Sequence, residues 1–251
     1  MNFMVDLYKK LKIYGIKKFA SYLVSELRNK YYELVVKSFS QRQEDLKIDE
    51  LLGHERRGFY VDVGAHDPTR FSNTKRFYLK GWCGINIEPD ANRFQMFVKE
   101  RTRDINLNLG VTSGEEGMMT FYKIFPPTLS TFSAEEAKSY VQQGYQLLEE
   151  VKVKTKSLAY ILDTYAQDKK IDFISIDTEG FDMIVLKSNN WEKYRPMLIC
   201  IESVNHTQDG SGQEHLDQEK FLLNLGYTKV YDNNINAIFK DSAQLLTNVE
   251  Q

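Results

Sequence analysis

Two carboxylates stand close together at the end of an apolar run. Asp177 and Glu179 follow residues 173–176. Paired carboxylates can raise the pKa of one member, which then serves as a general base near neutral pH; alternatively the pair binds a divalent cation such as Mg²⁺. His66 is a further candidate base, because imidazole titrates close to neutral pH. We therefore expect Asp177, Glu179 and His66 in a catalytic site, while a helix-capping or substrate-positioning role for His66 stays open.

A second group of residues has the features of a nucleotide site. Gly64 and Ala65 follow the apolar residues 59–63 and are small enough to let the backbone approach a ligand. Glu88 ends the next apolar run, 26 residues after Asp62 (88 − 62 = 26). Rossmann-like folds place an acid near this position to bind the ribose hydroxyls. The alternative for Glu88 is a cap on the helix that starts near residue 90.

The glycine loop lacks the pattern of a dinucleotide site. It carries one glycine where the pyrophosphate-binding fingerprint has three, which disfavours a nicotinamide or flavin cofactor. The four histidines show no close pairing, so we expect no histidine-based zinc site.

Alternating strands and helices must position these residues. Apolar runs predict strands at residues 59–63, 83–88, 105–111, 118–124, 151–155, 172–177 and 197–202. Helical patterns lie between them at residues 72–79, 90–99, 134–148, 158–165 and 183–187. This order predicts an α/β, Rossmann-like fold with a mostly parallel sheet and helices on both faces. Residues 227–239 predict an antiparallel hairpin at the sheet edge.

The N-terminal segment differs in charge from the rest of the chain. Residues 1–40 hold eight Lys/Arg and three Asp/Glu, a net of +5 within a total of −2. Apolar residues recur there every three or four positions, which predicts an amphipathic helical extension over residues 1–45, ahead of a domain at 46–251. The extension packs as a cap on the domain or makes a peripheral contact with a membrane or a partner complex; both interpretations stay open.

Composition and charge limit the partners and the cellular location that we expect. The near-neutral total charge argues against a nucleic-acid partner. Cys83 and Cys200 lie in separate apolar stretches, as free thiols of a reducing cytoplasm do. No apolar run reaches the roughly 18 residues of a membrane span, and charges interrupt the N-terminus where a signal peptide is apolar. We expect a cytoplasmic protein, with a location peripheral to the inner membrane face as the alternative.

Four blocks together resemble the FkbM-type methyltransferases, which are similar to class I S-adenosylmethionine-dependent O-methyltransferases. They are residues 58–66, residues 72–74 with 81–89, residues 129–131, and residues 172–180. The resemblance extends over roughly residues 40–203 and implies S-adenosylmethionine as cofactor. It implies transfer of a methyl group to a hydroxyl of a small molecule or glycan, a sugar before other acceptors.

The resemblance also implies roles for individual residues. Gly64, with its neighbours Asp62 and Ala65, would approach the amino-acid end of the cofactor. Ser72, Asn73 and Thr74 would hold its carboxylate and Glu88 its ribose. Asn108 and Gly110 would border the adenine. The chain departs from the common family pattern at Asp67, more often His, and at Asp182, more often Glu, so the acceptor side is where it would differ.

Two other functions remain open. One is a metal-dependent sugar O-methyltransferase in which Asp177, Glu179 or Glu202 binds Mg²⁺ and orients the acceptor. We expect the metal-free base instead, because the acids at the strand ends can be assigned to the cofactor and the chain has no carboxylate cluster with the spacing of a metal loop. The other is a non-catalytic, cofactor-binding scaffold of a glycan assembly complex. The acceptor and the oligomeric state cannot be inferred from the sequence.

Overall fold

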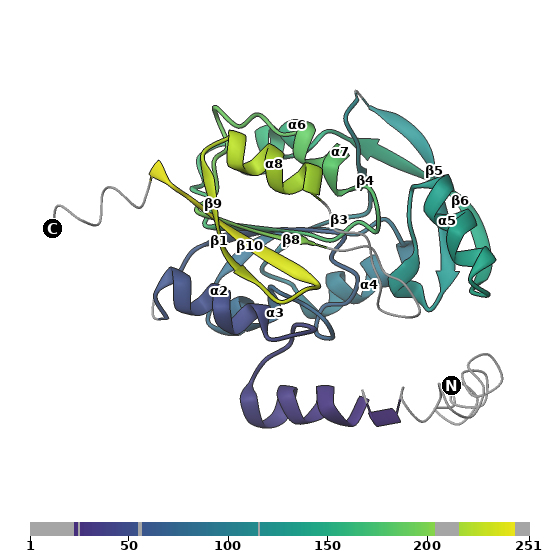
Figure 1. Ribbon diagram of the computed structural model, residues 1–251, viewed down its shortest axis with the longest axis horizontal. Helices are drawn as coiled ribbons and strands as arrows, with labels where there is room; N and C mark the ends of the chain where they lie inside the picture. The colour runs from purple at the N-terminus through teal and green to yellow at the C-terminus, as the bar shows by residue number, and fades with distance from the viewer. Residues whose placement is uncertain (1–22, 25, 55–56, 115, 204–215, 244–251) are drawn as a thin grey trace, which may run out of the picture.

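A seven-stranded sheet forms the centre of the computed structural model, which describes residues 23–24, 26–54, 57–114, 116–203 and 216–243 (Figure 1). Its strand order is β3-β2-β1-β7-β8-β10-β9. The strands are β1 (Phe59–Val63), β2 (Cys83–Ile87), β3 (Ile105–Leu107), β7 (Phe173–Ile176), β8 (Leu198–Glu202), β9 (Tyr227–Asp232) and β10 (Asn236–Asp241). The first five are parallel, and β10 pairs antiparallel with both β8 and β9. The predicted parallel sheet with a C-terminal hairpin is confirmed.

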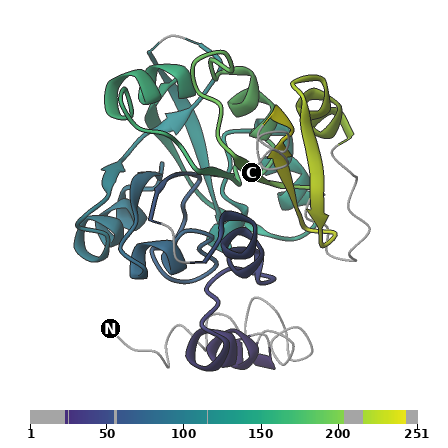
Figure 2. The ribbon, with the colours of Figure 1, turned by 90° about the vertical axis from the view of Figure 1, so that its left-hand side faces the viewer.

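Helices cover both faces of this sheet. On one face lie α2 (Glu44–Leu52), α3 (Lys75–Leu79) and α4 (Ala91–Glu100); on the other lie α6 (Leu158–Tyr165), α7 (Asp182–Lys187) and α8 (Leu216–Asn224). Figure 2 shows the β9–β10 hairpin, in yellow, at one edge of the sheet. Asp90 and Ser157 cap α4 and α6, since their side chains accept the N–H groups of Asn92 and Tyr160.

The alternation of side chains along β1 explains why helices pack on both faces of the main sheet. Val61 and Val63 point into the core beneath α6 and α7, whereas Tyr60 packs on the opposite face with Phe77 and Trp82. Side chains of a strand alternate between faces, so a strand that is apolar at every position but one is buried on both sides. The exception is Asp62, which sits on the α3 face near the carboxyl end of the strand.

A second, three-stranded sheet was not expected. It has the order β4-β6-β5, with β4 (Gly110–Val111), β5 (Gly117–Phe125) and β6 (Gln146–Lys156), and it carries η2 (Pro127–Leu129) and α5 (Ala134–Gln142). The strand predicted at 105–111 is in fact two: β3 belongs to the main sheet and β4 to this one. The helix predicted over 134–148 ends at Gln142, because Gly144 takes a left-handed φ of 89° and turns the chain into β6.

The N-terminal extension is described from residue 23 onward, so the predicted helices over residues 1–22 lie outside the described residues. Residues 26–31 are helical and continue into η1 (Tyr32–Val36), which lies beyond the α2–α3 layer, away from the sheet (Figures 1 and 2). Large apolar side chains such as Leu27 and Leu34 are exposed there. Among the described helices, none combines the length and the apolar character needed to cross a lipid bilayer.

Candidate active site

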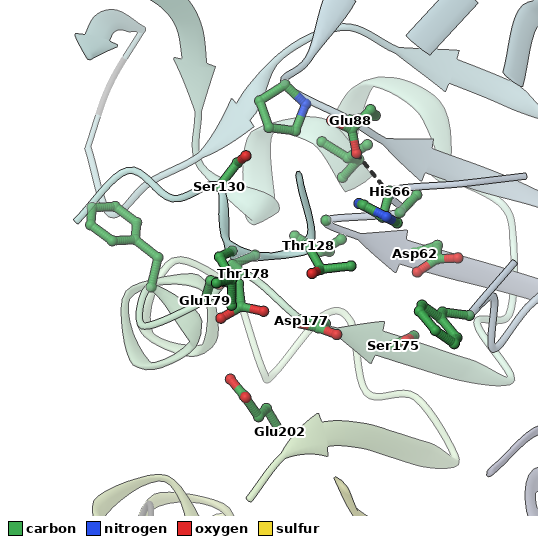
Figure 3. Close-up of a pocket in the computed structure, with 18 of the residues that line it drawn as sticks. Asp62, His66, Glu88, Thr128, Ser130, Ser175, Asp177, Thr178, Glu179 and Glu202 are labelled. Carbon is green, nitrogen blue, oxygen red and sulfur yellow. Dashed lines mark hydrogen bonds between the residues drawn. The ribbon is translucent and has the colours of Figure 1, made fainter. Parts of the chain in front are cut away.

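A cavity of about 650 Å³ opens at the carboxyl ends of β1, β2 and β7 (Figure 3). The chain runs from β1 to β2 and β3 on one side and later places β7 on the other side of β1. Strand order therefore reverses between β1 and β7, and ligands of open α/β sheets bind at such a point. The volume is in the range of pockets that hold small ligands.

Most of the residues proposed for the site line this one cavity. They are Asp62, Gly64, Ala65, His66, Asn73, Glu88, Gly110, Asp177 and Glu179. Ser72, Thr74 and Asn108 do not line it. The structure thus brings together the glycine loop, the acid after β2 and the carboxylates after β7, which come from three separate parts of the sequence.

The glycine loop is fixed against two neighbouring strands. The N–H groups of Gly64 and Ala65 both donate to the carbonyl oxygen of Ile87, at 3.0 and 3.1 Å. On the other side, the N–H of Asp177 donates to the carbonyl of Val63 at 3.0 Å. Gly64 has a φ of 77°, a conformation that favours glycine. The loop is therefore set by backbone contacts.

Glu88 contacts the start of α4 and also faces the cavity. Its carboxylate accepts the N–H of Asp90, at the start of α4, and the N–H of His66, each at 2.7 Å. It also lines the cavity with only 4% of its surface exposed. Burial raises the pKa of Glu88 to about 8, although the two N–H donors and Arg93 oppose the shift. Each carboxylate oxygen has a further lone pair to offer a ligand hydroxyl.

Ser72 and Thr74 belong to a buried polar network beneath the loop. The hydroxyl of Thr74 donates to Asp62 at 2.7 Å, and Arg101 donates to Ser72 Oγ at 2.9 Å. Arg101, fully buried, also donates to the hydroxyl of Tyr60 at 3.1 Å and to the carbonyl of Pro68 at 2.9 Å. These residues hold the loop in place from below.

The sequence gives no sign that Arg101 supports the site, because its spacing from the other site residues follows no known motif. Its hydrogen-bond partners come from β1 and from the segment at residues 68–74, about 30 to 40 positions earlier. Asn108 has a similar bracing role, because its amide donates to the carbonyl groups of Glu88 and Pro89 at 2.9 and 3.0 Å. Gly110 does border the cavity, where a Cβ would lie 2.3 Å from the ring of Phe132.

His66 lies between Glu88 and Arg93 with a left-handed φ of 57°. Its backbone N–H donates to the Glu88 carboxylate, and its backbone carbonyl oxygen accepts from the Arg93 guanidinium at 3.1 Å. Burial, together with the positive charges of Arg93 and Arg70, lowers the pKa of His66 well below 6.5. Its imidazole is therefore neutral at physiological pH and a weak base.

The opposite end of the cavity is acidic. Asp177 faces the cavity. The surrounding protein displaces much of the water near its carboxylate, and Asp182 and Asp62 repel its negative charge. Together these effects raise the pKa of Asp177 to about 7. Figure 3 shows Glu179 and Glu202 facing the same space. Burial and repulsion from Asp177 raise the pKa of Glu179, and burial and repulsion from Glu179 raise that of Glu202.

Glu179 is held in one orientation by two hydroxyl groups. Tyr140 of α5 donates to its carboxylate at 2.8 Å, and Thr131 donates to its carbonyl oxygen at 2.7 Å. Its φ of 50° is unusual for a side-chain-bearing residue and typical of a position fixed by its surroundings. Tyr140 is a further site residue that the sequence did not reveal, because it lies 39 positions from its partner. Among the described residues, no three His, Cys, Asp or Glu side chains are placed to hold a metal ion.

The open parallel sheet, the small-residue loop after β1 and the acid after β2 define a nucleotide-cofactor-binding α/β protein. A profile of the methyltransferase FkbM domain matches residues 62–229, about two thirds of the chain. The chain belongs to the FkbM methyltransferase family, as the four sequence blocks indicate. No curated protein gives a significant match to the sequence.

Solved structures give distant similarities. One is the 1,6-didemethyltoxoflavin-N1-methyltransferase of Burkholderia thailandensis, crystallised with bound 1,6-didemethyltoxoflavin and S-adenosylhomocysteine. It is 10% identical, with 90% of each chain covered and a TM-score of 0.43. Another is the C-terminal domain of precorrin-6Y C5,15-methyltransferase from Rhodobacter capsulatus, 13% identical, with 78% of this chain and 86% of that chain covered and a TM-score of 0.39.

Proposed function

We propose that this protein is an S-adenosylmethionine-dependent O-methyltransferase that methylates a hydroxyl group of a small molecule or glycan, a sugar before other acceptors. The observation that carries the proposal is that one cavity joins Glu88, suited to a ribose, to Asp177, suited to accept a proton. Membership of the FkbM methyltransferase family supports the transfer of a methyl group.

The residues at the Glu88 end fit S-adenosylmethionine. The vicinal ribose hydroxyls need an acceptor, and the buried carboxylate of Glu88 keeps free lone pairs on the cavity side. Gly64 and Gly110 border the cavity, and a Cβ there would collide with the Asp177 carbonyl oxygen or the ring of Phe132. Asn73 lines the cavity too, and its amide donates to Ser175 Oγ at 3.0 Å. When bound, the cofactor supplies an electrophilic methyl group on a sulfonium centre.

The protein must then take a proton from the acceptor hydroxyl. General bases work best when their pKa lies near the working pH. The pKa of Asp177, raised to about 7, meets this condition, whereas the lowered pKa of His66 does not. We therefore assign proton removal to Asp177 and a positioning role to His66. Burial and repulsion from Asp182 and Asp62 keep the basicity of Asp177 high, and Glu179, whose own pKa is raised, lies beside it.

The decisive experiment has two stages. Calorimetry should detect binding of S-adenosylhomocysteine, and radiolabelled S-adenosylmethionine should then be incubated with nucleotide-sugars, lipid-linked glycans and small phenols. We expect a product whose methyl group is lost under ether-cleaving conditions. Cofactor binding without turnover on any acceptor would favour the scaffold function. Activity that EDTA abolishes and magnesium restores would favour the metal-dependent mechanism instead.

A further inference from the structure

Glu202, the last residue of β8, has a buried carboxylate that is directed into the cavity. It faces Glu179 and Asp177 in Figure 3, and only 8% of its surface is exposed. Within the described part of the chain, nothing donates a hydrogen bond to this carboxylate. A largely buried carboxylate that no protein group binds must be satisfied from the cavity side, so this position is suited to a ligand that supplies the missing donor.

The described residues form no ion pair with these acids either. Among the described residues, no Lys, Arg or His forms an ion pair with Asp177, Glu179 or Glu202. The one hydrogen bond to these three carboxylates within the described residues comes from the neutral hydroxyl of Tyr140. Two arginines line the same cavity. Arg93 contacts the His66 carbonyl at the other end, and Arg42 forms no ion pair with any of the three acids. Three acids therefore face one space. Burial raises the pKa of each, and repulsion from Asp177 adds to the rise at Glu179 and at Glu202.

The chemistry of the occupant follows from these contacts. It must donate hydrogen bonds and carry positive charge, and an anionic group such as a phosphate would be repelled. A metal ion would need converging ligands, which the described residues do not provide. A protonated amine has three N–H donors and one charge, which suits carboxylates set further apart. The rings of Phe132 and Phe181, 5.9 Å apart, line the same cavity and can pack against the carbon skeleton that bears the amine.

We propose that the acceptor carries a protonated amino group, that Glu202 and Glu179 bind this group, and that Asp177 faces the neighbouring hydroxyl. The acceptor is then an amino sugar, an aminocyclitol or a similar amino alcohol. This inference rests on the proposed function and narrows its substrate class.

Binding the amine in its protonated form also directs the methyl group. An ammonium has no lone pair and cannot be alkylated, so the hydroxyl oxygen is the nucleophile. Its O–H bond breaks as Asp177 takes the proton, and a new O–C bond forms. The carbon–sulfur bond breaks with its electron pair left on sulfur, and the proton passes to solvent.

The test uses matched compounds and the full chain. Amino sugars, aminocyclitols and amino alcohols, each with its N-acetyl counterpart, are titrated into protein saturated with S-adenosylhomocysteine at pH 7, with binding followed by ligand-observed NMR. We expect at least one amine to bind about tenfold or more tightly than its N-acetyl form. Glu202→Gln should reduce this preference to less than about threefold.

Glu136→Gln is the matched control. Glu136 contributes repulsion to Glu202 but does not line the cavity, so its neutralisation should leave most of the preference intact. If Glu202→Gln does not fold, Tyr140→Phe replaces it: it removes the hydroxyl that orients Glu179 and should lower the preference severalfold.

Three results have distinct meanings. If S-adenosylhomocysteine binds but no amine is preferred over its N-acetyl form, the amine proposal is wrong and the proposed function stands. If chelator-treated protein binds magnesium and Glu202→Gln abolishes that binding, the carboxylates serve a metal and the amine proposal is also wrong. If S-adenosylhomocysteine does not bind at all, the proposed function fails first.

Discussion

Gly64 lies directly against the backbone of Asp177, so that a Cβ on Gly64 would be 1.9 Å from the Asp177 carbonyl oxygen. This contact joins the loop after β1 to the loop after β7 at the point where strand order reverses. The residue proposed to approach the cofactor thus also packs against the backbone of the proposed base.

Gly64→Ala should be strongly destabilising. The added methyl group meets a backbone atom that cannot move aside alone, and the φ of 77° disfavours any side chain. We expect a loss of at least about 2 kcal/mol in the free energy of unfolding, measured by urea denaturation. Gly114→Ala is the control, since a Cβ there meets nothing within 4 Å. Equal stability of the two variants would contradict the contact.

Glu88→Ala should weaken cofactor binding. Loss of charge-assisted hydrogen bonds to the ribose is expected to cost about 1.5–3 kcal/mol, or roughly a 10- to 150-fold rise in Kd for S-adenosylhomocysteine by calorimetry. Glu88→Gln keeps an oxygen acceptor for one of the two N–H donors and should lose less. Glu192→Ala, an exposed acid, serves as control. Wild-type affinity in a folded Glu88→Ala protein would exclude the ribose role.

Asp177→Asn should separate chemistry from binding. Removal of a general base is expected to lower kcat roughly 10²–10⁴-fold, while the Kd for S-adenosylhomocysteine changes little. His66→Gln should lower kcat by less than about tenfold, because the imidazole is a weak base here. In the wild type, kcat should rise with pH through about 7, the pKa of Asp177, and this step should vanish in Asp177→Asn. A larger effect at His66 would reverse the assignment.

The stability of the ligand-free protein should fall as pH rises from 6.5 to 8. Folding raises the pKa of Glu88 from 4.5 to about 8 and that of Asp177 from 3.8 to about 7, so over this range the folded state holds protons that the unfolded chain has lost. The lowered pKa of His66 acts in the opposite sense, because the unfolded histidine takes up a proton as the pH falls towards 6.5, but this one group is outweighed by the two acids. Thermal unfolding followed against pH should show the decline, and Glu88→Gln should flatten it.

Arg101→Met should destabilise the fold without touching the cavity wall. It removes the buried cation that binds Ser72, Tyr60 and the Pro68 carbonyl and leaves Asp104, 3.6 Å away, without its charge partner. Breaking a buried ion pair costs about 3–5 kcal/mol. Lys99→Met, on the exposed surface of α4, is the control and should change stability by less than about 0.5 kcal/mol.

The parts of the fold that the sequence predicted are those with clear burial patterns. Residues 158–165 form α6 as expected, because a capping Ser157 precedes the apolar stripe of Leu158, Ile161 and Leu162. The helix predicted over 134–148 overlaps the start of β6, where residues 146–150 are all exposed and show no alternation between buried and exposed positions. A strand of this kind is specified by its pairing with β5, which a local pattern does not contain.

The residues of the candidate site also fall into those that the sequence identifies and those that it does not. Residues at strand ends could be found because the carboxyl ends of parallel strands meet at one edge, and this rule located Gly64, Glu88 and Asp177. Arg101 and Tyr140 could not be found, because they reach their partners through contacts between distant segments. The roles of the lining residues remain predictions.

The first and last strands of the small second sheet lie next to each other. Its first strand, β4, pairs with the end of β6, so that Gly110 lies beside Thr155 and Val111 beside Lys156. The intervening chain carries Ser130, Phe132 and Tyr140, which border the cavity or hold a residue that does. A segment whose two ends are neighbours can lengthen, shorten or be exchanged without displacing the strands on either side. Under the proposed function, this segment could therefore change in evolution, and with it the acceptor, while the strands proposed to hold the cofactor stay the same.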